Sequence, residues 1–235
     1  MRRNTSAGRL NRAKIVAVVV GLLERDGVEA VSTRTIGEAL NVHPTALYRH
    51  FRDMDELLRE AADRILAGVV EAAAGKASGD NLDAAAELCR EVRTVLIDHP
   101  GAARVMSSGP SRMRNERALT ETLLALLSET GLTDDEVVRA YHALVEFTVG
   151  SAAIDTMDSA DPPEEVEARH RTWRADYLVA PPDRFPQTTR LATLMYPSQD
   201  DQFSFGLDLM ICGLRERARG RLTSADQPAA GFVKS

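Results

Sequence analysis

The chain has 235 residues, 44% of them hydrophobic and only 5% aromatic, so it can bury a core and its composition favours helix over sheet. The longest apolar run, residues 15–23, is too short to cross a bilayer, and the segment before it lacks the core of a secretory signal, so we expect a cytoplasmic protein with no membrane partner. The formal net charge is −6 but uneven: residues 1–52 hold nine basic and four acidic side chains, whereas the remainder holds twenty basic and thirty-one acidic ones. A basic segment on an acidic body is typical of a module that faces phosphate, although a solvated N-terminal arm would look the same.

Three short helices are predicted near the N-terminus. Residues 11–25 carry apolar side chains at the spacing of an amphipathic helix. Ser32 or Thr33 can cap a second helix, "RTIGEAL", and Asn41 tolerates the left-handed conformation of a sharp turn. Pro44 suits the first turn of a third helix, "PTALYRHF". A second and third helix joined by a tight turn indicate a helix-turn-helix, whose second helix enters the major groove of DNA.

The side chains of this third helix divide into three groups. Leu47 and Phe51 lie about one turn apart and are expected to face the domain core. Tyr48 and His50 offer hydrogen-bond donors to phosphate. The side chains expected to face base edges are Pro44, Thr45, Ala46 and Arg49. Because a capped helix pair with a tight turn is also common in all-α proteins that bind no DNA, topology alone leaves both interpretations open.

The remainder of the chain is predicted to be helical as well. Asp53 can cap a helix, and Glu56 three residues later completes a capping-box-like pair. Helices are expected at about 53–75, 82–98, 102–107, 112–129, 133–156, 165–178, 188–195 and 200–218. No strand pattern appears, so the fold class is predicted to be all-α, and the tail, 219–235, is expected to be disordered.

One long segment, "GVEAVSTRTIGEALNVHPTALYRHFRDMDELL", resembles the N-terminal domain of the TetR (tetracycline repressor) family of bacterial regulators, including its Leu-Tyr-x-His-Phe core. Three later segments, "HPGAARVM", "FTVGSAAID" and "FSFGLDLMICGL", resemble the tetracycline-repressor subclass more loosely. The resemblance implies a helix-turn-helix DNA-binding domain with a basic arm over residues 1–52, and a larger helical ligand-binding and dimerisation domain over residues 53–218.

The resemblance also assigns DNA contacts to individual residues. Base reading falls on Arg34, Pro44, Thr45, Ala46 and Arg49, and phosphate contacts fall on Thr33, Tyr48 and His50. A bidentate contact from Arg34 to a guanine would contribute about 1–3 kcal/mol of discrimination, and the alternative is an ordinary solvated arginine. Met54 stands where the family often has a lysine that contacts phosphate, so that contact is in doubt.

For the second domain, the resemblance implies a homodimer and a ligand pocket. The pocket lining is expected to comprise Leu88, Val92, Met106, Leu119, Thr122, Val138, Tyr141 and, from the partner chain, Trp173. The dimer interface is expected to include Gly150, Ala153, Gly206, Met210 and Gly213, several of them small enough to let helices approach closely. Ordinary packing within one chain remains an alternative for every residue of both sets.

The sequence departs from the tetracycline repressor at the metal site of that protein. Met106 stands in the position of a metal-binding histidine, and Ile154, followed by Asp155, stands in the position of a carboxylate. A thioether and an alkyl group cannot replace the hard ligands that Mg²⁺ requires. We therefore expect no metal or other cofactor, and an effector that is a metal-free, largely apolar small molecule.

These patterns favour a ligand-responsive transcriptional regulator, a repressor, that binds palindromic double-stranded DNA as a homodimer and is released by its effector. A helical protein-docking or sensor module that binds no DNA is the alternative, but Arg34 and Arg49 disfavour it because charges are depleted from the cores of protein interfaces.

An enzyme is not expected. The Glu-x-x-His pair at residues 167–170 has the spacing found twice in di-iron helical bundles, but here it occurs once. No Ser/His/Asp arrangement, glycine-rich phosphate loop or Cys-x-x-Cys pair is present in the sequence.

Overall fold

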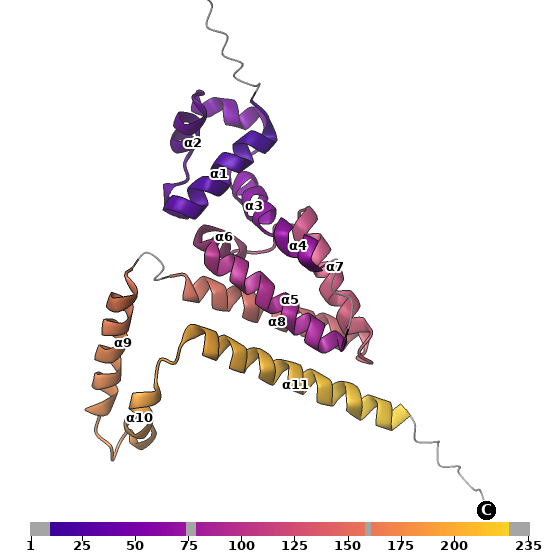
Figure 1. Cartoon of the computed structure of the whole chain (residues 1–235), viewed down its shortest axis with the longest axis vertical. Coiled ribbons are helices and arrows are strands. Elements are labelled where there is room, and N and C mark those ends of the chain that lie inside the picture. Colours follow the sequence, from indigo (N-terminus) through magenta and orange to yellow (C-terminus); the bar gives the residue numbers. More distant parts are fainter. Residues whose placement is uncertain (1–9, 74–78, 158–160, 226–235) are drawn as a thin grey trace, which may run out of the picture.

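The computed structural model describes residues 10–73, 79–157 and 161–225 (Figure 1). Within these ranges the chain forms helices and loops and no strand, so the predicted all-α class is confirmed. None of the helices in the described part of the chain is long and apolar enough to cross a membrane. Figure 1 shows a small helical head, a larger body below it, and an arm that stands away from the body.

The head consists of α1 (Arg12–Asp26), η1 (Val28–Ala30), α2 (Thr33–Leu40) and η2 (Pro44–Arg49), where η denotes a 3₁₀-helix. Ser32 caps α2, because its hydroxyl accepts from the backbone N–H of Thr35 while the Thr35 hydroxyl accepts from the backbone N–H of Ser32. Asn41 has φ 53° and ψ 47°, which confirms the left-handed turn predicted there.

The third helix of the head differs from the prediction. It is a 3₁₀-helix, in which the N–H groups of Ala46 and His50 bond to the carbonyl groups of His43 and Leu47, three residues earlier. The segment between the turn at Asn41 and the next helix is short, and 3₁₀ winding is common in such short pieces. Leu47 nevertheless faces inward as predicted, as does Phe51, and both are almost fully buried.

Close approach of α2 and η2 depends on Gly37. A Cβ atom at Gly37 would lie 2.9 Å from the carbonyl oxygen of Val42 and 3.4 Å from the ring of Pro44. Because the first of these neighbours is backbone, it cannot rotate away, and glycine is the residue that permits this turn geometry.

The body contains α3 (Met54–Ile65), α4 (Ala67–Ala73), α5 (Asn81–Asp98), α6 (Pro100–Ser107), α7 (Arg114–Ser128), α8 (Asp134–Asp155) and α11 (Gln199–Ala225). Helices α5, α8 and α11 contact one another, and α7 packs on α5 and α8. Helix α3 belongs to two cores: Leu57 and Ala61 pack with the head, past the domain boundary expected at residue 52, whereas Ala62 packs with the body.

Two helix boundaries differ from the predictions. The helix expected at 53–75 breaks at Leu66, whose side chain is buried in the body core, and Gly68 follows with a low helix propensity. The last helix continues to Ala225 instead of ending near 218, because residues 221–225 include good helix formers and no proline. Residues 226–235 of the expected tail lie outside the described part of the chain.

The arm, residues 163–196, contains α9 (Pro163–Leu178), α10 (Pro186–Leu191) and η3 (Ala192–Leu194). Figure 1 shows α9 and α10 to one side of α5, α8 and α11. The arm is held together by its own aromatic rings: Tyr196 stacks on His170 at 5.2 Å and meets Trp173 at 5.1 Å between ring centroids. Helix α9 has no buried residue, so the arm exposes most of its surface in a single chain.

Candidate DNA-binding face and effector cavity

The eight side chains expected to contact DNA all reach the surface of the head. Arg34, Thr45, Tyr48 and Arg49 are exposed, and Thr33, Pro44, Ala46 and His50 are half-buried. Within the described residues, no hydrogen bond or ion pair holds the side chains of Tyr48 and Arg49. These two groups are therefore available for a partner outside the chain.

Two of the other side chains have local partners. The hydroxyl of Thr45 lies 2.8 Å from Nδ1 of His43, the residue that caps η2. Arg34 is 3.7 Å from Glu38 across one turn of α2, and both side chains are mostly exposed. An exposed pair at this distance is weak, so a nucleic-acid partner could replace it at little cost.

Arg12 has a structural role that the sequence did not reveal. Its Nε donates to Glu60 at 2.6 Å, its Nη2 to Glu56 at 2.7 Å, and its Nη1 to the carbonyl oxygen of His50 at 2.6 Å. The hydrogen bond to Glu60 raises the pKa of Arg12, and the guanidinium in turn lowers the pKa of Glu56. Arg12 thus fixes the end of η2 against α3 and does not extend the DNA-binding face, although it contributes to the basic charge of the head.

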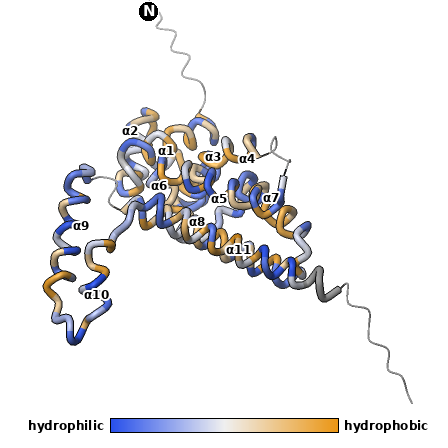
Figure 2. The backbone as a smooth tube through the Cα atoms, turned by 60° about the horizontal axis from the view of Figure 1, so that its bottom comes forward, coloured by the Kyte–Doolittle hydropathy of each residue, from blue (hydrophilic) through white to orange (hydrophobic). Residues whose placement is uncertain are grey.

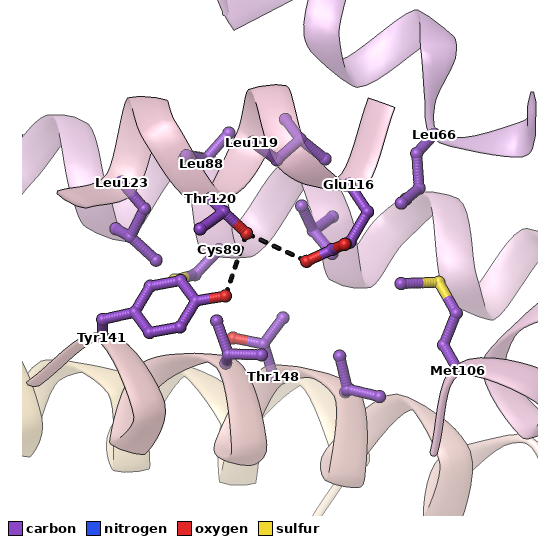
Figure 3. Close-up of a pocket in the computed structure, with 13 residues that line it drawn as sticks. Leu66, Leu88, Cys89, Met106, Glu116, Leu119, Thr120, Leu123, Tyr141 and Thr148 are labelled. Atoms are coloured by element: carbon purple, nitrogen blue, oxygen red, sulfur yellow. Dashed lines mark hydrogen bonds between the residues drawn. The ribbon is translucent and has the colours of Figure 1, made fainter. Parts of the chain in front are cut away.

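The body contains a cavity of about 70 Å³ lined by residues of α5, α7 and α8, with further contributions from α6 and from Leu66 (Figure 3). Five of the eight residues expected in a ligand pocket line it: Leu88, Val92, Met106, Leu119 and Tyr141. The set expected from the resemblance thus includes four of the eight Leu, Val and Met side chains that line this cavity, and Tyr141.

The other three expected residues lie elsewhere in the single chain. Thr122 borders a separate groove between α5 and α7, which also carries Asp83 and Glu87. Val138 is half exposed on the outer side of α8. Trp173 belongs to the aromatic cluster of the arm. Ile154, which stands in place of a metal-site carboxylate, is 64% exposed and does not line the cavity.

Three polar side chains meet in the cavity, and the sequence predicted only one of them. Thr120 donates to Glu116 Oε1 at 3.0 Å, and the hydroxyl of Tyr141 lies 2.9 Å from the same Thr120 oxygen (Figure 3). The backbone N–H of Arg112 donates to Glu116 Oε2 at 3.0 Å. The i, i+4 spacing of Glu116 and Thr120, next to the apolar Leu119, is the signal that could have identified this group.

Two further polar side chains, Thr148 and Cys89, line the cavity. The hydroxyl of Thr148 is buried, at 2% exposure, and makes no hydrogen bond of ordinary geometry. It lies near the thiol of Cys89, whose pKa is raised by burial and lowered to a smaller extent by this hydroxyl. Figure 3 shows Thr148 on α8 facing the space below Thr120.

The residues expected at a dimer interface have different surroundings in one chain. A Cβ at Gly206 would overlap the ring of Phe147, so this glycine already serves the packing of α11 on α8. Met210 packs on the body core. A Cβ at Gly150 or Gly213 would have no other atom within 4 Å, so packing inside the chain does not account for these two glycines.

Helices α8 and α11 also expose large apolar side chains. Phe205 is 63% exposed and Leu209, one turn later on α11, is 59% exposed. Figure 2 shows hydrophobic residues alternating with hydrophilic ones along α11. An apolar surface of this kind is characteristic of an interface with another protein.

The fold and the exposed helix-turn-helix define a DNA-binding transcriptional regulator. A family model described as "Bacterial regulatory proteins, tetR family" matches residues 15–61, and one described as "Tetracyclin repressor-like, C-terminal domain" matches residues 75–218. The chain therefore belongs to the TetR family of transcriptional regulators.

Similar proteins include both characterised repressors and solved structures. An HTH-type transcriptional regulator of Saccharopolyspora erythraea is 32% identical over 173 residues, which cover 72% of this chain and 72% of that protein. The class A tetracycline repressor from transposon 1721 of Escherichia coli is 26% identical over 86% of this chain and 89% of its own length. The structure of ActR from Streptomyces coelicolor in complex with (S)-DNPA has the same fold, with a TM-score of 0.78, 23% identity, and coverage of 89% of this chain and 99% of that one.

Proposed function

We propose that this protein is a cytoplasmic repressor that binds a palindromic operator as a homodimer and is released when a small, largely apolar molecule enters the cavity. The observation that carries the proposal is the position of Tyr48 and Arg49, whose side chains have no partner in the described part of the chain. They lie on a helix-turn-helix whose supporting helix, α3, continues into the body that holds the cavity. The tetracycline repressors among the similar proteins support repression as the mode of control. The structure of ActR in complex with (S)-DNPA supports the binding of a small molecule by this fold.

On DNA, the base-reading role falls to Arg34, Pro44, Thr45, Ala46 and Arg49, and the phosphate role to Thr33, Tyr48 and His50. Two recognition helices must lie about 34–36 Å apart to enter successive turns of the major groove. A twofold dimer meets this requirement and makes the operator palindromic.

For the dimer, α8 and α11 supply the interface. Burial of Phe205 and Leu209 by a second copy removes apolar surface from water. The open space beside Gly150 and Gly213 then admits the backbone or side chains of the partner helices. Ala153 lies on the same helix as Gly150 and is half-buried.

Asp63 provides a physical connection between the cavity and the head. Its carboxylate is 5% exposed and accepts from the hydroxyl of Ser111 at 3.0 Å and from the backbone N–H of Glu116 at 2.8 Å on Oδ1. The backbone and side-chain N–H groups of Asn115 donate to Oδ2 at 3.2 and 3.1 Å. Because Asp63 lies on α3 and Glu116 lines the cavity on α7, a ligand that moves Glu116 changes the support of α3.

The mechanism follows from a difference in affinity between two conformations. An effector that binds better to one tilt of α3 shifts the dimer towards that tilt and changes the spacing of the recognition helices. Met106 in the cavity offers no hard metal ligand, so this effector is expected to bind without Mg²⁺. Metal-dependent stabilisation by tetracycline in a thermal-shift assay would contradict this part of the proposal.

The test of the function is selection of duplexes from a random pool with the purified protein, followed by fluorescence anisotropy of the selected duplex over a range of salt concentrations. We expect a palindromic sequence and an affinity that falls steeply with salt, because several phosphates are neutralised. The matched control is a variant with Tyr48→Phe and Arg49→Ala, which should enrich nothing. If the wild-type protein enriches no duplex, with or without cell extract, the head is a protein-docking module instead.

A further inference from the structure

The chemistry of the cavity restricts the class of effector, an inference that rests on the proposed function. Most of its lining is apolar, and the ionisable groups among the described lining residues are one carboxylate, one thiol and one phenol. It contains no lysine, arginine or histidine side chain in this set. An anionic ligand would therefore meet Glu116 without a cation to compensate its charge.

The hydrogen bonds of Glu116, Thr120 and Tyr141 run in one direction. The hydroxyl of Thr120 donates its hydrogen bond to the carboxylate of Glu116. The contact between Thr120 and Tyr141 must then use the proton of Tyr141. Both hydroxyl protons are thus directed towards the carboxylate, and the group keeps spare lone pairs but no spare donor. A ligand group that meets these three side chains has to donate a hydrogen bond.

Thr148, two turns after Tyr141 on α8, imposes the opposite requirement. Its side chain lines the cavity, and among the described residues its hydroxyl has no hydrogen-bond partner of ordinary geometry. The neighbouring thiol of Cys89 is only a weak acceptor, so a ligand oxygen can compete for this proton. A buried hydroxyl without a partner is unfavourable, and a ligand with an acceptor oxygen would satisfy it. The cavity therefore favours a ligand that carries both a donor for the Glu116 group and an acceptor for Thr148.

The volume of the cavity and the flexibility of its lining side chains indicate the hydrocarbon framework of the effector. The volume of about 70 Å³ is smaller than the roughly 150 Å³ of a cavity that holds benzene, so a ring has to displace a side chain. Met106 is the flexible candidate, and its thioether, like the ring of Tyr141, makes favourable contacts with aromatic groups.

We infer that the effector is an uncharged, hydroxylated aromatic compound whose hydroxyl donates to Glu116 and whose second oxygen accepts from Thr148, and that carboxylates of the same size are excluded. Glu116 and Thr148 are then the residues that determine effector specificity. Met106 and the other apolar side chains supply contact area and do not distinguish a phenol from an acid.

The test compares four probes of one skeleton by isothermal titration calorimetry on the full chain: naphthalene, 2-naphthol, 2-naphthoate and 6-acetyl-2-naphthol. We expect 2-naphthol to bind about tenfold more tightly than naphthalene and 2-naphthoate, a difference of about 1.4 kcal/mol. The acetyl carbonyl should add further affinity in the wild type and none in a Thr148→Val variant. Glu116→Gln should abolish the preference for 2-naphthol over 2-naphthoate, whereas Glu121→Gln, the same change on the exposed side of α7, should preserve it.

The ranking of the probes on the wild-type chain decides the inference even if a variant fails to fold. A Leu119→Phe variant, which fills the cavity, should reduce the affinity of every probe and so locate the binding. If 2-naphthoate binds as tightly as 2-naphthol, or the preference survives Glu116→Gln, the inference is overturned while the ligand cavity of the proposed function stands. If no probe binds, the inference is overturned too, and the operator selection tests the DNA-binding part of the proposed function separately.

Discussion

Arg34 and Tyr48 are both exposed on the head, but their expected contacts with DNA differ in kind. The guanidinium of Arg34 has only a weak exposed partner in Glu38, and its planar donors match the acceptors of a guanine. Tyr48 is 55% exposed and offers one hydroxyl. A contact to a base edge carries sequence information, whereas a contact to phosphate only fixes position.

We therefore predict different consequences for the two residues. Arg34→Ala should reduce discrimination at one base pair of the operator by about 1–3 kcal/mol. Tyr48→Phe should weaken all duplexes about equally, because the lost hydrogen bond goes to the backbone of the DNA. Anisotropy on the selected operator and its single-base variants measures both, with Arg90→Ala in the body as the control. Equal weakening of every duplex by Arg34→Ala would assign that side chain to phosphate.

At the residue scale, the sequence predicted the positions whose behaviour depends on near neighbours. Asn41 in the left-handed turn and inward-facing Leu47 follow from local conformational preferences and helical spacing. The roles of Arg12 and Asp63 depend on contacts with residues 38 or more positions away, which no local pattern encodes. In the polar group around Glu116, the i, i+4 pair of Glu116 and Thr120 is local, but the contact of Thr120 with Tyr141 joins two helices and could not be read from spacing.

At the scale of the secondary-structure elements, features encoded by near neighbours were again predicted, and features set by distant contacts were not. The caps at Ser32, one of two candidates, and at Asp53 were identified correctly, because each side chain accepts from a backbone N–H only three residues later. The break between α3 and α4 was not predicted, because Leu66 is drawn into a core built from other helices. The 3₁₀ form of η2 likewise depends on the short distance between two neighbouring elements.

Asp63 is the residue through which two elements, α3 and α7, support each other. Asp63→Asn removes the charge and presents an amide to donors that need an acceptor, so we predict a loss of about 1–3 kcal/mol in the free energy of unfolding. Hydrogen exchange of the backbone amides of Asn115 and Glu116 should accelerate, because both donate to this carboxylate. Asp55→Asn on exposed α3 surface is the matched control. Unchanged exchange in the first turn of α7 would show that the two helices are held by other contacts.

The junction of the head with α3 should be sensitive to acid. The pKa of Asp53 is lowered by the backbone N–H of Glu56 and by Arg52, and the pKa of Glu56 is lowered by Arg12 and by the backbone N–H of Arg52. Folded-state values below the unfolded ones, which are about 4, stabilise the fold above that pH. This stabilisation is lost as the pH falls through the lowered values.

The measurement is urea denaturation at a series of pH values from neutral to about 3, on the wild type and on Glu56→Gln. The wild type should lose stability on acidification, and the variant should lose less because one of the groups no longer titrates. An identical pH dependence for the two proteins would mean that Glu56 has the same pKa in the folded and unfolded chains.

At the scale of the whole molecule, two glycines of α11 allow the folding of one chain and the assembly of the dimer to be tested separately. Gly206→Ala should lower the thermal stability of the chain, since its Cβ would overlap the ring of Phe147. Gly213→Ala has open space in one chain and a better helix propensity by about 1 kcal/mol, so the fold itself should not be weakened. If α11 meets a partner helix closely, the same Cβ obstructs the contact, and we predict weaker self-association in sedimentation equilibrium. A dimer that is unchanged by Gly213→Ala would place the interface on another part of α11.

The hydrogen bonds of Asp63 join α3 and α7, and any coupling that they carry between the cavity and the head acts in both directions. Its carboxylate supports α3 and the first turn of α7 through the same hydrogen bonds. If ligand binding in the cavity changes the DNA affinity of the head through these bonds, DNA binding by the head changes the ligand affinity of the cavity. Thermodynamic reciprocity makes the two factors equal: if the effector weakens operator affinity a hundredfold, operator-bound protein binds the effector a hundredfold more weakly. The DNA site would then act as an antagonist of the effector, and copies of the protein that are not on DNA would capture the first effector molecules.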